Sequence, residues 1–206
     1  MSLNKGIFIV FEGIDGCGKS TQLRALAERL HAHGIEPLVI REPGGTPVGE
    51  QIREILLEHP FEMDPLTELL LYEASRSELT RTVLRPALQS GQVVLADRFA
   101  MASLAYQGYG RGLDLTLVRQ FNTIATEGIE PSMTIVIDVP VEVALARKRS
   151  SFDRLERAGL EFHERVRRGY RELAQQTPRS LLLDGTRPAS ELAEQIWHAV
   201  YPLFPI

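Results

Sequence analysis

The sequence has little cysteine, no long apolar run and no excess of basic residues. One cysteine excludes an internal disulfide and a cysteine-based zinc site, and the five histidines show no metal-ligand spacing. No apolar run approaches the roughly 20 residues of a membrane span, and residues 7–11 are too few for a signal segment. A formal net charge of −4 argues against a nucleic-acid partner. We therefore expect a cytoplasmic protein that binds neither membranes nor nucleic acids.

Short apolar runs alternate with longer amphipathic stretches. The runs are continuous rather than alternating, which is typical of strands buried on both faces of a parallel sheet, and they cover residues 7–11, 38–40, 93–95, 133–137 and 181–183. Between them, apolar residues recur at helical spacing, as at Leu23, Leu26 and Leu30. The order predicts an α/β fold: a doubly wound, five-stranded parallel sheet with helices on both faces. At 206 residues we expect a single domain over residues 1–206.

A glycine-rich segment after the first strand predicts a phosphate-binding loop (P-loop). Residues 13–20 match G-x-x-x-x-G-K-[ST] between a predicted strand and a predicted helix, the context that this motif requires. Its backbone N–H groups and the helix N-terminus would hold phosphates, and Lys19 would add a charge. Ser20 and Asp97 are the candidate Mg²⁺ ligands. The residues predicted to bind ATP are Gly13, Ile14, Asp15, Gly16, Cys17, Gly18, Lys19, Ser20, Thr21 and Arg147.

Cys17 lies inside this loop and has two interpretations. We favour a small residue that fills a variable position. The alternative is a reactive thiolate, because Lys19 and a helix N-terminus are near.

A second set of cations stands apart from the loop. Arg41 and Arg98 directly follow apolar strands, Arg76 lies in a predicted helix, and residues 147–149 form a basic cluster. Two cation sets suggest two phosphorylated ligands, a donor and an acceptor. The alternative is that each arginine is a surface ion-pair partner, although a charge at a buried strand end, such as Arg98, needs a specific reason. No guanine-reading N-K-x-D motif is present, which counts against a GTPase.

Six segments, in order, resemble the thymidylate kinase family. They are residues 12–21, the string R-E-P-G-G-T at 41–46, Tyr72 four residues before Arg76, D-R-F at 97–99, A-Y-Q-G at 105–108 with G-R-G at 110–112, and R-x-x-x-D-R-L-E at 149–156. The resemblance implies a nucleotide kinase fold of the P-loop type, with a short lid at about 147–159. It also implies phosphoryl transfer from ATP to dTMP with Mg²⁺, and a homodimer.

The resemblance also implies roles on the acceptor side. Tyr72 would stack on thymine, and Arg76 would donate to thymine O4, so that the amino donor of cytosine would be refused. Tyr106 would exclude a 2′-hydroxyl, and Gln107 would be a second contact to the base edge. The residues expected to bind dTMP are Asp15, Arg41, Tyr72, Arg76, Arg98, Ser103, Tyr106 and Gln107.

The expected catalytic residues are Asp15, Lys19, Arg98 and Arg149. Some members of the family carry a basic residue inside the phosphate loop, but Gly16 and Cys17 stand there in this sequence. The resemblance then implies that Arg149 of the lid neutralises the migrating phosphoryl group, with Arg147 on the adenine side.

Two other functions remain open from the sequence. The first is another nucleoside monophosphate kinase or a deoxynucleoside kinase, because the phosphate-binding residues would serve any monophosphate. The second is a non-catalytic ATP-binding module, against which the intact Lys19, Asp97, Arg98 and Arg149 argue.

Overall fold

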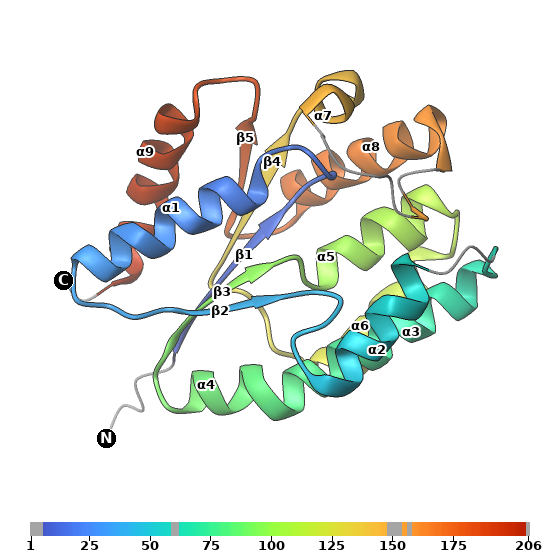
Figure 1. The fold of residues 1–206 in the computed structure, drawn as a ribbon, viewed down its shortest axis with the longest axis horizontal. Coiled ribbons are helices and arrows are strands. Elements are labelled where there is room, and N and C mark those ends of the chain that lie inside the picture. Colours follow the sequence, from blue (N-terminus) through green and yellow to red (C-terminus); the bar gives the residue numbers. More distant parts are fainter. Residues whose placement is uncertain (1–5, 59–61, 148–153, 156–157, 205–206) are drawn as a thin grey trace.

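The fold is built on a five-stranded parallel sheet. Of the 206 residues, the computed structural model describes 6–58, 62–147, 154–155 and 158–204. The strands pair in the order β2-β3-β1-β4-β5, every pair parallel, which confirms the expected fold class (Figure 1). Their bounds are Ile7–Glu12 (β1), Leu38–Arg41 (β2), Val93–Asp97 (β3), Met133–Asp138 (β4) and Ser180–Asp184 (β5).

The strands differ in how deeply they are buried. The inner strands β1, β3 and β4 are mostly buried, as their continuous apolar runs predicted. The prediction of burial on both faces is wrong for the edge strands β2 and β5, where most side chains are partly exposed and Val39 is 51% exposed. An edge strand has a neighbour on one side only and lies where the covering helices end, so solvent reaches part of its surface.

Helices cover both faces of the sheet. In Figure 1, α1 and α9 lie on one side and α3, α4 and α6 on the other, while α8 contacts β4 and β5. The helix α3 continues through a π-helical turn, η1, into α4, and α5 continues into a second one, η2. The bounds are Lys19–Ala32 (α1), Pro47–Leu57 (α2), Pro65–Leu79 (α3), Thr80–Leu84 (η1), Arg85–Gln89 (α4), Ala100–Ser103 (α5), Leu104–Gly110 (η2), Leu115–Thr126 (α6), Val141–Arg147 (α7), Leu160–Gln176 (α8), Ala189–Val200 (α9) and Tyr201–Leu203 (η4, a 3₁₀ turn).

Local sequence signals set several helix ends. The side chain of Thr46 accepts a hydrogen bond from Gly49 N at 2.9 Å, and Asp64 and Asp114 cap α3 and α6 in the same way. Gly34 follows the end of α1 with φ 79°, a left-handed conformation that glycine adopts without strain. Among the described residues, no helix is long and apolar enough to cross a bilayer.

The parallel sheet places the carboxyl ends of its strands at one edge. Glu12, Arg41, Asp97 and Asp138 are the last residues of β1, β2, β3 and β4. In an open α/β sheet this edge is where ligands bind. The polar residues that the sequence places after the apolar runs are therefore brought together there.

Candidate active site

The segment between β1 and α1 is a glycine-dependent turn. Gly13 has φ 134°, and a Cβ there would collide with the carbonyl oxygen of Ile137. Gly16 has φ 82°, and a Cβ there would collide with the carbonyl oxygen of Ala144. Side chains at these positions would force the loop away from β4 and α7, so the motif glycines maintain its close packing.

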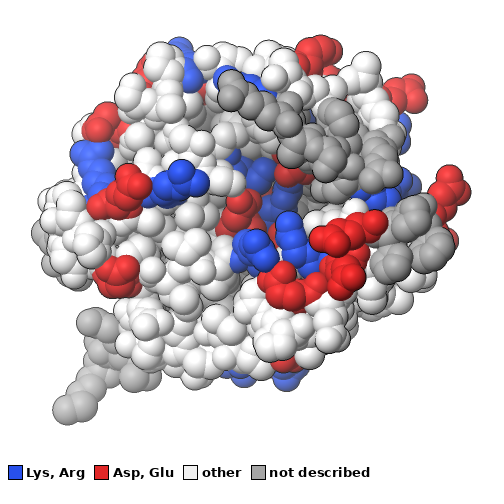
Figure 2. Space-filling model, viewed as in Figure 1, with Lys and Arg blue, Asp and Glu red and all other residues white. Residues whose placement is uncertain are grey.

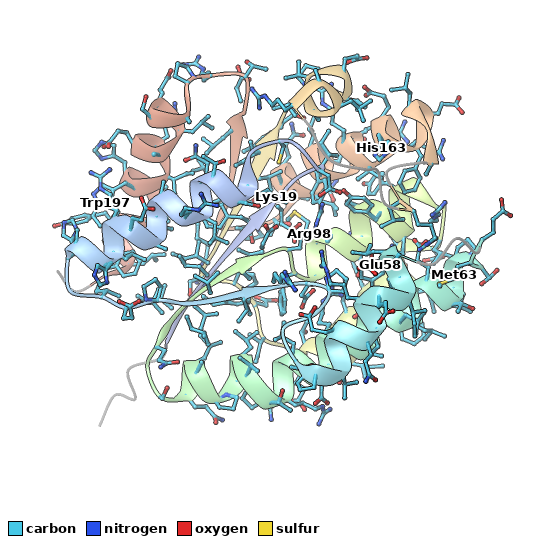
Figure 3. The ribbon with its side chains drawn as sticks, in the orientation of Figure 1. Lys19, Glu58, Met63, Arg98, His163 and Trp197 are labelled. Carbon is cyan, nitrogen blue, oxygen red and sulfur yellow. The ribbon has the colours of Figure 1, made fainter. Side chains whose placement is uncertain are left out.

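The loop delivers Lys19 and an open helix N-terminus to the same place. Gly18 precedes α1 and has no side chain to cap it, so the first N–H groups of the helix are left for a ligand. Lys19 is 6% exposed, and its Nζ donates to the carbonyl oxygens of Gly13 at 2.9 Å and Ile14 at 3.0 Å. Figure 3 shows Lys19 close to Arg98 near the centre of the molecule. The arrangement suits the phosphates of a nucleotide.

The predicted metal ligands meet beside this loop. Ser20 Oγ donates to Asp97 Oδ2 at 3.0 Å, across 77 positions in the chain. Mg²⁺ binds oxygen ligands and often takes only one or two from the protein, with water and substrate phosphates as the others. The described residues contain no group of three or more His, Cys, Asp or Glu that could hold a metal alone. The pair fits Mg²⁺ that arrives with a nucleotide.

One cavity joins the phosphate loop to the second set of predicted residues. Its volume is about 510 Å³, and Figure 2 shows Lys, Arg, Asp and Glu side chains gathered at a hollow of the face that it displays. The lining residues expected from the sequence are Asp15, Gly16, Gly18, Lys19, Ser20, Thr21, Arg41, Tyr72, Asp97, Arg98, Ser103, Tyr106, Gln107 and Arg147. The walls therefore combine donor-side and acceptor-side candidates.

Arg98 is held at the junction of the two sides. It follows β3 directly, and its guanidinium donates to Asp15 Oδ1 at 2.5 Å, to the Tyr106 hydroxyl at 3.1 Å and to the Tyr170 hydroxyl at 2.9 Å. Burial opposes its charge, but Asp15, Tyr106, Tyr170 and Asp97 together outweigh burial and keep the pKa of Arg98 well above its usual value. This arginine is a fixed positive charge on the cavity wall.

Glu12 supports Arg98 from inside the protein. It is 0% exposed, its Oε1 accepts from Phe99 N at 2.9 Å, and its Oε2 accepts from the Tyr170 hydroxyl at 2.9 Å. Burial raises the pKa of the Glu12 carboxyl, while the charge of Arg98 opposes that rise. Burial likewise raises the pKa of both the Tyr170 and Tyr106 hydroxyls, so these side chains keep their protons.

Arg76 lies beneath the cavity and outside its lining. It is 1% exposed, it is absent from the cavity lining, and its donors all meet protein acceptors. These acceptors belong to Glu42, Glu73, Ser103, Asn122 and the carbonyl of Phe99, at 2.5 to 3.1 Å. The structure therefore places Arg76 beneath the cavity wall, and its predicted contact with a base stays a prediction. The physical reason is that two buried carboxylates draw the guanidinium under the cavity, where it supports Ser103.

This buried cluster also shifts the ionisation of Glu42. Burial raises the pKa of Glu42 to about 7, although the neighbouring Arg76 acts in the opposite direction. Glu42 Oε1 and Glu73 Oε2 are buried and have no hydrogen-bond partner among the described residues. The negative charge of Glu73 adds to this rise, so Glu42 keeps its proton to a higher pH than an ordinary glutamate.

The remaining sequence candidates divide between the cavity and the undescribed segment. Arg41 lines the cavity and also donates to Glu50 at 2.9 and 3.0 Å, and Arg147 Nη1 donates to the carbonyl of Cys17 at 3.5 Å. Arg149, the expected lid arginine, lies outside the described residues.

Cys17 is 1% exposed, and burial raises the pKa of its thiol despite the nearby Lys19. The structure thus favours the small-residue interpretation of Cys17 over a thiolate.

Sequence reasoning missed several residues of this site. Glu42 and Pro43 line the cavity, and the R-E-P-G-G-T string was the signal that could have pointed to them. Arg53 also lines it and donates to the carbonyl of Pro43 at 2.8 Å. Tyr170 reaches Arg98 from α8, far away in the chain and outside any motif, so no sequence signal could have assigned it.

Comparisons with known proteins agree with this geometry. The family model described as thymidylate kinase matches residues 11–196. A thymidylate kinase from Deinococcus radiodurans is 51% identical over 201 residues, covering 96% of this chain and 98% of its own, and one from Desulforudis audaxviator is 52% identical over 202 residues, covering 96% and 91%. A crystal structure of thymidylate kinase from Ehrlichia chaffeensis superimposes with a TM-score of 0.80 at 31% identity, covering 96% of this chain and 99% of that one. The chain belongs to the thymidylate kinase family.

Proposed function

We propose that the protein transfers the γ-phosphoryl group of ATP to dTMP, giving dTDP and ADP. The observation that carries the proposal is the shared cavity, in which the phosphate loop faces Arg98 and an aromatic wall of Tyr72 and Tyr106. A switch GTPase or a hydrolase needs one phosphate site, whereas this cavity offers cations on both sides. The names of the relatives support thymidylate as the acceptor.

We assign separate tasks to the two sides of the cavity. Lys19 and the N-terminus of α1 would hold the β- and γ-phosphates of ATP, and Arg98 with Arg41 would bind the phosphate of dTMP. Asp15 contacts Arg98 and Tyr106 in the structure, so it would orient both toward the acceptor. Ser20 and Asp97 would hold Mg²⁺, which neutralises phosphate charge when bound. Because phosphoryl transfer is mostly a matter of positioning and charge, these residues supply what the reaction needs.

A lid at about residues 147–159 would complete the site, with Arg149 contributing positive charge over the migrating phosphoryl group. The absence of a basic residue at Gly16 and Cys17 supports this assignment. Arg147, the last residue of α7, already lines the cavity beside the phosphate loop. It would bind the donor nucleotide on the adenine side.

A panel of acceptors tests the proposal. With ATP and Mg²⁺, we expect dTMP to have the highest kcat/KM among dTMP, dUMP, dCMP, dAMP and thymidine, with formation of a diphosphate measured by chromatography. A preference for dAMP, dCMP or thymidine would favour another nucleoside monophosphate or deoxynucleoside kinase. Tight ATP binding with no transfer to any monophosphate would favour a non-catalytic ATP-binding module.

We also propose a homodimer in the cytoplasm. Exposed apolar side chains on three neighbouring helices support an interface, namely Val48 and Ile55 on α2, Leu66 and Leu70 on α3, and Ile124 on α6. Patches of this kind mark association sites when they are contiguous. Sedimentation or light scattering of the purified protein measures the oligomeric state.

A further inference from the structure

Glu68 is a fully buried carboxylate that the proposed reaction leaves unused. It lies on α3, four residues before Tyr72 and therefore on the same face of the helix, and it is 0% exposed. Its Oε1 accepts from Gln107 Nε2 at 2.8 Å. Its Oε2 meets Arg111 Nη2 at 3.0 Å and Arg154 Nη2 at 2.7 Å. Two arginines from different segments thus hold this carboxylate against one amide of the cavity wall.

The network fixes which end of the Gln107 amide faces the cavity. Guanidinium groups carry only donors, so the two arginines require Glu68 to be an acceptor. Glu68 in turn requires the NH₂ end of Gln107, because an amide oxygen facing a carboxylate would place acceptor against acceptor. Gln107 lines the cavity at 1% exposure, and within the described part of the chain no donor contacts its Oε1. The amide oxygen is therefore the end available to a ligand.

We propose that Glu68 is a positioning residue for substrate choice: it holds Gln107 with an acceptor toward the base, so the site selects nucleobases with an N–H on that edge. The inference rests on the proposed function and deepens it. Thymine has a donor at N3, whereas cytosine has an acceptor at the same place. Cytosine would therefore place an acceptor against the Gln107 oxygen that Glu68 holds in place.

A Glu68→Gln variant tests the orientation directly. The new amide would turn its oxygen to Arg111 and Arg154 and its NH₂ to Gln107, so Gln107 would rotate and present NH₂ to the base. The matched substrates are dTMP and 5-methyl-dCMP, which differ only at N3 and the 4-position. We expect the ratio of their kcat/KM values to fall by at least about 10-fold, because a buried donor would then face the N–H of thymine.

A reciprocal swap separates orientation from general damage. In Glu68→Gln with Gln107→Glu, the carboxylate at position 107 would accept from the amide at 68 and again offer an oxygen to the base. We expect this double variant to restore most of the wild-type ratio. In a Gln107→Met background, which has no amide to orient, Glu68→Gln should leave the ratio unchanged.

Different outcomes would contradict the role of Glu68 and the proposed function. A folded Glu68→Gln variant with the wild-type ratio, or one that still shifts the ratio when Met stands at 107, would overturn the inference. If Glu68→Gln alone does not fold, the double variant is compared with Gln107→Met, and a double variant that discriminates no better overturns it as well. Wild-type protein that does not phosphorylate dTMP would instead refute the proposed function, so the two failures are distinct.

Discussion

At the scale of single residues, Arg98 shows how the backbone aims a charge. Its φ of 74° lies in the left-handed region, which costs a non-glycine residue roughly 1 kcal/mol or more. Hydrogen bonds on both sides hold it there: Arg98 N donates to the Phe11 carbonyl at 2.9 Å, and the next N–H, of Phe99, donates to Glu12. The turn sends the guanidinium back over the phosphate loop, where it meets the carbonyl oxygen of Gly13 at 3.1 Å.

Glu42 should make stability depend on pH near neutrality. Burial raises its pKa from the ordinary 4.5 to about 7, so folding takes up a proton between these values. The unfolded state then binds fewer protons than the native state, and stability falls as pH rises through this window. The contribution is fully present below pH 4.5, and at most roughly 3 kcal/mol of it is lost by the time pH passes 7.

A Glu42→Gln variant removes this titration and keeps the shape of the side chain. Urea unfolding of both proteins at pH 5, 6, 7 and 8 measures the difference in the free energy of unfolding. We expect the variant to gain stability relative to wild type as pH rises, because only the wild type loses the contribution of Glu42. Glu12 and the other titratable groups are present in both proteins, so their contributions cancel in the difference. A difference that does not change with pH would show that Glu42 keeps its ordinary pKa.

At the scale of elements, the sequence was informative where structure is local. Each of the five apolar runs became a strand, and the phosphate loop stands between β1 and α1 as its motif required. The exposure of β2 and β5 was not foreseen, because edge position depends on strand order, which an apolar run does not encode. The hydrogen bonds of Arg76 beneath the cavity could not be predicted, because its partners Glu42 and Asn122 come from distant segments.

The segment between α7 and α8 carries the next prediction, which concerns Arg149. We expect Arg149→Ala to lower kcat by at least about 10²-fold, because an arginine over the migrating phosphoryl group stabilises the transition state. The melting temperature should not change if the residue acts on the reaction and not on the fold. Steady-state kinetics with dTMP and ATP, together with thermal unfolding, measure both quantities.

A matched control comes from the neighbouring helix. Arg168 on α8 is 63% exposed and contacts Glu172 at 3.8 Å, so Arg168→Ala removes an arginine side chain at an exposed position. Such exposed pairs contribute little to stability. Near-normal turnover of Arg149→Ala, or an equal loss in Arg168→Ala, would remove Arg149 from the mechanism.

At the scale of the whole molecule, the cavity and the apolar helix face belong to the same elements. Tyr72 on α3 lines the cavity, while Leu66 and Leu70 on the same helix are 39% and 44% exposed. If the proposed dimer forms through Leu66 and Leu70, its contact lies on the same helix as Tyr72, the residue proposed to stack on the base. Ile124 on α6, at 67% exposed, extends the apolar surface to a helix packed against α3.

A charge placed on this face should separate the subunits. We expect the wild-type protein to have about twice the chain mass of 23.1 kDa by light scattering, and Leu70→Glu to have about the mass of one chain. In a two-fold interface the substitution appears on both sides, and burying two unpaired carboxylates costs several kcal/mol. Val39→Glu is the control, because Val39 is also half exposed but lies on the edge strand β2. A dimer that persists in Leu70→Glu, or that dissociates in Val39→Glu, would place the interface on another surface, and a monomeric wild type would exclude it.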